Sequence, residues 1–187
     1  DIACTLRGNM DASEYKQVIL GLIFLKYISD KFEAKYKELV AEGDGFEDDE
    51  DAYIAENIFF VPEDARWSYI LENANREEIG QVIDNAMKII EKNNTRLKNV
   101  LPKNFAREEL DKRKLGEVIT KFNNIEIPKN DNDVLGRAYE YCLSQFAEQE
   151  GKKGGEFYTP ECVVKTIVEI LKPYNGRVYD PCCGSGG

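Results

Sequence analysis

Residues 18–25 read Val18-Ile19-Leu20-Gly21-Leu22-Ile23-Phe24-Leu25, and this apolar run is the centre of a longer helical pattern. Apolar residues recur at steps of three and four from residue 15 to residue 39, which marks one stripe along an α-helix. Asp11 and Glu14 fit a capping box at its start, and Gly43 suits its end. Because the central run is apolar on most sides, we expect the middle of this helix to be buried.

Three further segments repeat the helical pattern. The first is opened by Asn75 and Glu78, a second capping box, and runs to residue 90. The others span residues 107–122 and 133–148. A short apolar run at residues 58–67 ends at Trp67, the single tryptophan, which we expect to anchor the core. Residues 1–149 are therefore predicted to form one helical domain without internal repeats.

Composition excludes several classes of protein. The 187 residues carry a net charge of −10, which argues against gripping nucleic acid by charge alone. Five cysteines occur without a C-x-x-C pair, and no histidine is present, so no metal site is predicted. The acidic residues 44–51 lack the ligand spacing of a calcium loop and are expected to form a solvated linker. No apolar run reaches the length of a membrane span, and we expect a cytoplasmic location with free thiols.

The character of the sequence changes after residue 149. Residues 150–156 are rich in glycine and lysine, which is typical of a domain boundary. Thr159 suits a helix N-cap with Pro160 at the first helical position, and the helical pattern then runs to Leu171. Residues 176–179 are expected to form a short buried strand. We expect the polypeptide to begin before Asp1 and to continue past residue 187.

The last eight residues form a glycine-rich loop, Asp180-Pro181-Cys182-Cys183-Gly184-Ser185-Gly186-Gly187. A backbone without Cβ atoms can approach a ligand closely, and open α/β sheets bind ligands where their strands end. A phosphate-binding P-loop is disfavoured because no Lys-Ser/Thr pair follows the glycines. A dinucleotide fingerprint stays open because its third glycine would lie past residue 187. The third possibility is the loop of S-adenosylmethionine-dependent methyltransferases.

The loop resembles the cofactor motif of amino-directed DNA adenine methyltransferases. Upstream, Gly155-Glu156-Phe157-Tyr158-Thr159-Pro160 is similar to their second cofactor motif. The order and separation of the two motifs resemble the modification (M) subunit of type I restriction-modification systems. Phe60-Val61-Pro62-Glu63-Asp64-Ala65-Arg66-Trp67, Gly136-Arg137-Ala138-Tyr139-Glu140-Tyr141 and the long first helix resemble that family's N-terminal domain. The resemblance covers nearly the whole chain.

The resemblance implies a mainly α chain whose helical domain (1–149) precedes the truncated start of an α/β, Rossmann-like methyltransferase domain (150–187). The implied reaction transfers a methyl group from S-adenosyl-L-methionine to the N6 atom of adenine in DNA. The implied cofactor-binding residues are Glu156, Phe157, Tyr158, Thr159, Pro160, Asp180, Pro181, Cys182, Gly184, Ser185 and Gly186. The family's Asn/Asp-Pro-Pro-aromatic motif is absent here. No catalytic residue is therefore predicted, and the 187 residues alone are expected to transfer no methyl group.

The implied partners are double-stranded DNA, a specificity subunit, a second copy of the M subunit and a restriction subunit, with no membrane. A basic run at Lys98, Lys103, Arg107, Lys112, Arg113 and Lys114, joined by Lys152 and Lys153, is interrupted by acidic residues and is expected to be a solvated face. Cys182 and Cys183 are expected to be small packing residues, and Tyr139 to pack in the core while Tyr141 faces the other side of its helix. The alternative function is a helical protein- or DNA-interaction module whose second domain methylates another substrate or binds a dinucleotide.

Overall fold

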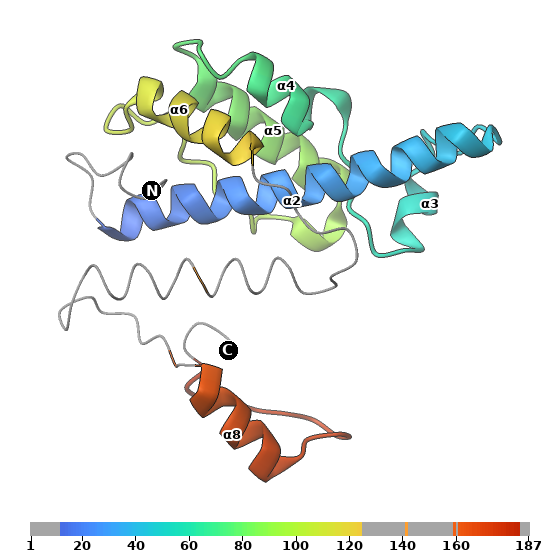
Figure 1. Ribbon diagram of the computed structural model, residues 1–187, viewed down its shortest axis with the longest axis vertical. Helices are drawn as coiled ribbons and strands as arrows, with labels where there is room; N and C mark the ends of the chain where they lie inside the picture. Colours follow the sequence, from blue (N-terminus) through green and yellow to red (C-terminus); the bar gives the residue numbers. More distant parts are fainter. Residues whose placement is uncertain (1–11, 125–140, 142–158, 160, 184–187) are drawn as a thin grey trace. The chain divides into compact units, whose positions relative to one another are not determined.

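The computed structural model of the chain describes residues 12–124, 141, 159 and 161–183. The chain divides into two compact units, Asp1–Leu135 and Gly136–Gly187. The first unit is a helical domain, drawn from blue to yellow in Figure 1. The predicted boundary after residue 149 and the predicted helix at 133–148, apart from Tyr141, lie outside the described residues. The domain limits at 149 and 150 therefore stay a prediction.

Helix α2 (Ala12–Glu42) is the longest element of the helical domain. Its 31 residues correspond to a rod about 45 Å long. The predicted buried middle is confirmed, because Val18, Leu22 and Leu25 are fully buried. The predicted end is also confirmed: Gly43 has a φ of +76° and donates its N–H to the carbonyl of Leu39 at 3.1 Å. This left-handed conformation strains most residues but not glycine.

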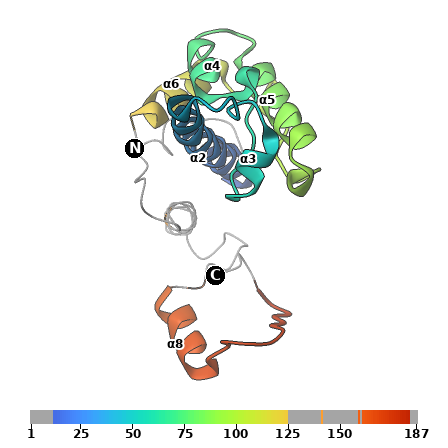
Figure 2. The same ribbon diagram turned by 90° about the vertical axis from the view of Figure 1, so that its right-hand side faces the viewer.

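The remaining elements of the domain are short. They are α3 (Glu50–Ile54), the 3-10 turn η1 (Glu63–Ala65), α4 (Trp67–Glu72), α5 (Ile79–Asn93), the 3-10 turn η2 (Thr95–Leu97) and α6 (Lys112–Asn123). Helices α4, α5 and α6 gather on one side of α2 in Figure 1, and Figure 2 looks nearly along α2. Helix α2 contacts α4 and α6, while α5 contacts α4, α6, η1 and η2. One core therefore forms between α2 and the other helices.

The core follows the apolar stripes of these helices. Its fully buried large side chains are Leu22, Leu25, Ile28, Phe32, Tyr53, Ile70, Ile79, Ile83, Met87, Ile90 and Phe105. The predicted role of Trp67 is confirmed, since it is only 2% exposed. Its backbone N–H, which begins α4, donates to the Ser29 hydroxyl at 2.7 Å. This bond satisfies a donor at the start of α4 and ties that helix to α2.

Two helix starts differ from their predictions. Helix α5 begins at Ile79, and Glu78 at its N-cap position makes no side-chain capping bond. The N–H of Ile79 instead donates to the carbonyl of Arg76 at 3.2 Å, so a backbone turn replaces the predicted capping box. Helix α6 begins at Lys112, later than predicted, because the Asp111 carboxylate caps it. The side chains of the capping box predicted at the start of α2 lie outside the description.

The acidic segment at residues 44–51 is partly helical, in contrast to the predicted linker. Helix α3 begins at Glu50, and the Asp49 carboxylate at its N-cap accepts a hydrogen bond from the N–H of Asp51. The prediction of a solvated segment is confirmed, because all of its side chains except that of Glu47 are exposed. Two acidic residues in its first turn favour this short helix because they complement the helix dipole.

Residues 161–183 of the second unit contain one helix, α8 (Glu161–Leu171), as the apolar pattern predicts. The predicted buried strand at residues 176–179 is wrong. Residues 177–180 have no regular secondary structure, and Val178 and Tyr179 are 78% and 86% exposed. A parallel strand needs neighbours for its backbone N–H and C=O groups, and no strand occurs among residues 161–183. Within the described ranges, no helix is long and apolar enough to cross a membrane.

Candidate functional site

The described part of the predicted cofactor loop is a turn held by its own aspartate. The Oδ1 atom of Asp180 accepts a hydrogen bond from the backbone N–H of Cys182 at 2.8 Å. Pro181 stands between them with a fixed φ and no N–H to satisfy. An aspartate bonded to the backbone two residues on is a typical turn arrangement. Asp180 thus stabilises the turn at residues 180–182.

The described residues of the predicted cofactor site face solvent. Thr159, Asp180, Pro181 and Cys182 are all exposed. Cys183 is exposed as well, so the predicted packing role of the two neighbouring thiols is wrong for this chain. Nothing in residues 161–183 covers them, because this stretch holds a single helix and its connections. The described part of the turn is therefore exposed to solvent.

Most of the second cofactor motif lies outside the described residues. The predicted site residues that the structure does not describe are Glu156, Phe157, Tyr158, Pro160, Gly184, Ser185 and Gly186. Helix α8 begins at Glu161, two residues after Thr159, and Pro160 is not described, so the role of Thr159 as N-cap stays a prediction. Tyr141 is 65% exposed, whereas Tyr139, Lys152 and Lys153 are not described. The meeting of the two cofactor motifs therefore stays a prediction.

The predicted basic face in the helical domain is partly committed to internal contacts. The Nζ of Lys103 lies 2.6 Å from Oε2 of Glu91, and this ammonium lowers the pKa of the Glu91 carboxyl. The Nζ of Lys112 donates to the carbonyl oxygens of Phe105, at 3.0 Å, and Arg107. Burial lowers the pKa of the Lys112 ammonium. The ammonium groups of these two lysines are therefore engaged in contacts within the domain, which reduces their contribution to any contact with DNA.

The loop between η2 and α6 is anchored by a residue that sequence reasoning missed. Asp84, on α5, is 8% exposed. Its two carboxylate oxygens accept hydrogen bonds from the backbone N–H groups of Phe105, at 2.9 Å, and Ala106, at 3.0 Å. The sequence feature that could have revealed Asp84 is its spacing, because it lies four residues after Gly80 and seven before Glu91. That spacing puts all three on one helix face, which suggests a face turned toward backbone rather than apolar side chains.

The same face of α5 accounts for its glycine. A Cβ atom at Gly80 would overlap the carbonyl oxygen of Phe105. Glu91, two turns along from Asp84, accepts a hydrogen bond from the N–H of Leu101 at 2.9 Å. The α5 face at Gly80, Asp84 and Glu91 thus contacts the loop at Leu101, Lys103, Phe105 and Ala106. We call this contact the α5 loop seat.

Neither region contains a metal centre in the described part of the chain. No group of three Cys, Asp or Glu side chains there is placed to hold an ion. This includes the acidic residues 44–51, whose carboxylates project outward.

Comparison with known proteins identifies two matched regions. Residues 1–122 match the HsdM N-terminal domain family, and residues 130–187 match the N-6 DNA Methylase family. The second region contains both predicted cofactor motifs, at residues 155–160 and 180–187. The order of the two regions agrees with the order that the sequence resemblance implies.

Individual relatives extend this agreement over the whole chain. The type I restriction enzyme MjaIX methylase subunit of Methanocaldococcus jannaschii is 40% identical over 204 residues, covering 100% of this chain and 37% of that protein. The HindI methylase subunit of Haemophilus influenzae is 38% identical over 148 residues, covering 68% of this chain and 33% of that protein. The MpnII methylase subunit of Mycoplasma pneumoniae is 27% identical and covers 100% of this chain and 41% of its own length. The chain thus spans well under half of these relatives.

Proposed function

This chain belongs to the HsdM N-terminal domain family, and from that premise we propose that it is part of the methylase subunit of a type I restriction-modification system. The observation that carries the proposal is the order of the two matched families. The helical domain is followed by a region similar to N-6 DNA methylases, and both cofactor motifs fall inside that region. The relatives named above are methylase subunits of type I restriction enzymes.

The reaction we propose is transfer of a methyl group to the N6 atom of adenine in DNA. S-adenosyl-L-methionine would supply the methyl group as an electrophile bound to sulfur. An adenine in a duplex must leave the base stack before its amino group can reach such a donor. Catalysis then depends mainly on aligning the amino nitrogen with the methyl carbon. This chain would contribute to holding the donor in place.

The residues proposed to hold the donor are those of the two motifs. The exposed turn at Asp180 fits this role, because its backbone is already bent by the bond between Asp180 and Cys182. Small residues follow, which would let the backbone approach the donor closely. Thr159 and the other residues at positions 156–160 would border the donor, and Gly184, Ser185 and Gly186 would line the other side. No described residue is assigned a catalytic role.

The partners proposed for the subunit are DNA, a specificity subunit, a restriction subunit and a second methylase subunit, in the cytoplasm. The charge of the chain supports DNA binding that is shared with other subunits. At −10 overall, the chain would gain little from contacts with phosphates by itself. The internal engagement of Lys103 and Lys112 reduces that contribution further. Sequence selection would then rest with another subunit.

The test is donor binding and methyl transfer by the whole subunit purified with its specificity subunit. Asp180→Ala removes both the carboxylate charge and the turn bond, whereas Asp180→Asn retains an oxygen that can accept from Cys182. We expect Asp180→Ala to weaken binding of S-adenosyl-L-methionine by at least about tenfold, in proportion to a lost charge-assisted hydrogen bond. Isothermal titration calorimetry measures the affinity, and incorporation of labelled methyl groups into unmodified DNA measures the reaction.

Glu169→Gln is the matched control, because Glu169 is an exposed carboxylate on α8 outside the loop. It should leave donor affinity unchanged. Normal affinity in both Asp180 variants would contradict the proposed site. Absence of N6-methyladenine with the unsubstituted complex and its own DNA would contradict the proposed reaction. An Asp180→Asn variant that binds normally beside a defective Asp180→Ala would assign Asp180 to shaping the turn.

A further inference from the structure

The far end of α2 carries an unusual distribution of charge. Between Glu38 and Ala65 the chain has eleven acidic residues and neither lysine nor arginine. All 25 basic residues, and the other 24 of the 35 acidic ones, lie elsewhere. The acidic residues of this segment are Glu38, Glu42, Asp44, Glu47, Asp48, Asp49, Glu50, Asp51, Glu56, Glu63 and Asp64. Residues 38–65, which we call the acidic tip, therefore account for the entire net negative charge of the chain.

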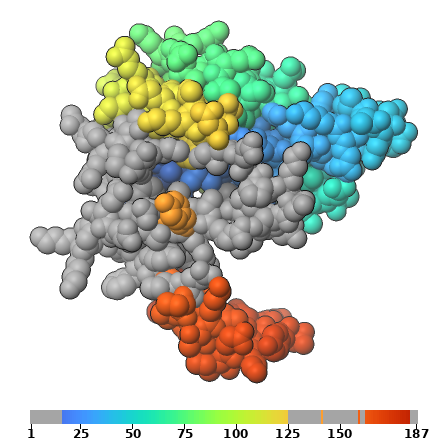
Figure 3. Space-filling view, in the orientation of Figure 1, coloured from blue at the N-terminus to red at the C-terminus, as the bar shows by residue number. Residues whose placement is uncertain are grey.

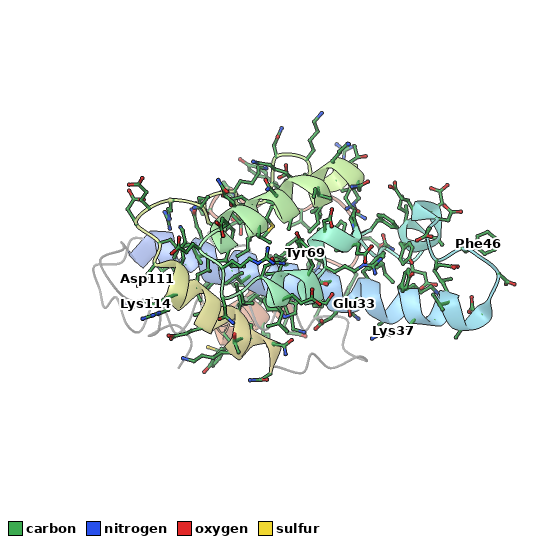
Figure 4. All side chains as sticks on the ribbon, turned by 90° about the horizontal axis from the view of Figure 1, so that it is seen from above. Glu33, Lys37, Phe46, Tyr69, Asp111 and Lys114 are labelled. Atoms are coloured by element: carbon green, nitrogen blue, oxygen red, sulfur yellow. The ribbon has the colours of Figure 1, made fainter. Side chains whose placement is uncertain are left out.

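The acidic tip projects from the helical domain. The last turns of α2 and the loop that follows extend past α4 and α5 in Figure 1, and Figure 3 shows this end as a protrusion of the domain. Figure 4 places Phe46 at this end, with Asp111 and Lys114 at the opposite end. Ten of the eleven acidic residues are exposed, and Glu47 is half-buried. The domain thus presents a negative end to its surroundings.

Packing and hydrogen bonds order the tip despite its crowded charges. Tyr53 of α3 is fully buried and stacks on Phe32 of α2, with ring centroids 4.7 Å apart. Its hydroxyl donates to the backbone carbonyl of Glu47. The N–H of Asp49 donates to the carbonyl of Phe46 at 3.1 Å. A surface ordered before it binds loses less entropy on association.

Apolar side chains are exposed within this charged surface. Among residues 16–124, five large hydrophobic side chains are exposed, and three of them belong to the tip. Phe46 is 53% exposed, Val40 is 49% and Ile54 is 58%. The other two, Tyr69 and Val100, lie elsewhere on the domain. Apolar anchors ringed by charge are typical of protein–protein contacts.

From these observations we propose that the acidic tip is a docking surface for a basic surface of another protein chain, with Phe46 inserting as its anchor. Glu38 and Glu56 pair with Lys35 of α2, at 3.3 Å and 2.7 Å. Charge complementarity selects this occupant, because the other nine carboxylates of the tip attract Lys and Arg side chains and steer their approach. The same charge repels DNA and anionic lipid surfaces. The tip contains none of the proposed donor-binding residues, so this contact is separate from the methylase site.

The first experiment identifies what touches Phe46. In the whole subunit, assembled with its partner subunits and DNA, Phe46 is replaced by p-benzoyl-L-phenylalanine and the complex is irradiated. We expect a crosslink to a Lys- and Arg-rich segment of another polypeptide, mapped by mass spectrometry. The same replacement at Val100, which is 68% exposed outside the tip, should not yield that product. Crosslinks to DNA, crosslinks confined to the same polypeptide, or none at all would overturn the proposal.

The second experiment tests charge with matched variants. Asp48→Asn, Glu50→Gln and Asp51→Asn are combined, leaving Asp49 to cap α3. We expect the dissociation constant for the crosslinked partner to rise about tenfold and to depend less on salt. The control combines Glu77→Gln, Glu108→Gln and Glu109→Gln, three exposed carboxylates outside the tip. Equal affinities of the two triple variants would refute a docking role, and unchanged thermal unfolding would verify that both are folded.

Discussion

Helices α5 and α8 have similar apolar patterns but opposite surroundings. On α5, Ile79, Ile83, Met87 and Ile90 are fully buried. On α8, Ile167 and Ile170 are 48% and 75% exposed. Periodicity places apolar residues on one face of a helix, but burial depends on the elements that meet that face. In α5 these elements are α4, α6 and the turns η1 and η2.

This contrast distinguishes the stability that a helix has by itself from the stability that it gains by packing against other elements. An isolated helix of eleven residues, the length of α8, is marginal in water, because most helical stability in proteins comes from packing. The α5 loop seat illustrates the opposite case, where a helix receives apolar neighbours on one face and a backbone segment on another. Substitutions should therefore have large effects on α5 and small effects on α8.

The largest expected effect is in the core of α5. Ile83→Ala should lower the free energy of unfolding of the helical domain by about 3 kcal/mol, because it leaves a cavity among fully buried side chains. Urea unfolding followed by the fluorescence of Trp67, the single tryptophan, measures this change. Ile170→Ala on α8 is the matched control and should alter the transition by less than about 0.5 kcal/mol. Equal effects would remove the contrast between the helices.

The next effect tests how closely the loop approaches α5. Gly80→Ala should destabilise the domain by about 2 kcal/mol, because its Cβ would overlap the carbonyl of Phe105 and move the backbone. Asn85→Ala is the control, since Asn85 is exposed on the same helix. Thermal unfolding of both variants gives the comparison. If Gly80→Ala were neutral or stabilising, the loop would not rest on this helix face.

A smaller effect should follow from loss of one hydrogen bond at the same face. Asp84→Asn retains one acceptor oxygen but turns an NH₂ group toward a backbone N–H, so we expect a loss of about 1.5 kcal/mol. Hydrogen exchange at Phe105 and Ala106 should accelerate in this variant, which would localise the effect. Exchange that accelerates equally throughout the domain would assign Asp84 a merely global role.

The smallest effect concerns pH. Because Lys103 lowers the pKa of Glu91, the charged carboxylate favours the folded state. This contribution is complete above the ordinary pKa of about 4.5 and is lost as the pH falls through the lower value of the folded state. Glu91→Gln should thus cost about 1 kcal/mol or less at pH 7, and the difference from the unsubstituted chain should shrink below pH 4.5. Urea titrations at several pH values measure it, with Glu77→Gln as the control. A difference that is constant down to pH 3 would contradict this account.

Much of the helical domain could be predicted from residue patterns. The extent of α2, its end at Gly43 and the burial of Trp67 follow from apolar spacing and from the conformational freedom of glycine. The residues at which helices begin were harder to predict from the sequence. At Ile79 a backbone turn supplies the bonds that a side-chain cap was expected to provide. Competing local bonds of similar strength decide such details.

The candidate site was predicted from short motifs rather than from apolar periodicity. The two motifs led to the resemblance, and the matched families agree with it over the length of the chain. The bond from Cys182 to Asp180 gives that loop a shape that the order of residues only suggests. Asp84 was missed because a buried carboxylate satisfied by backbone N–H groups leaves little trace in composition. Residues 44–51 of the acidic tip were predicted to be only a solvated linker, since the attachment of the tip through Tyr53 depends on contacts far apart in the chain.

The order of the residues was enough to predict the longer described helices and the family, because periodicity, glycine positions and short motifs act over a few neighbouring residues. The tertiary structure alone decided which apolar faces are covered, as the contrast between Ile83 and Ile170 demonstrates. It also decided that Lys103 and Lys112 serve the fold and that the charge of the acidic tip is held at one end of the domain. Burial and charge placement depend on segments distant in sequence, and only folding brings those segments together.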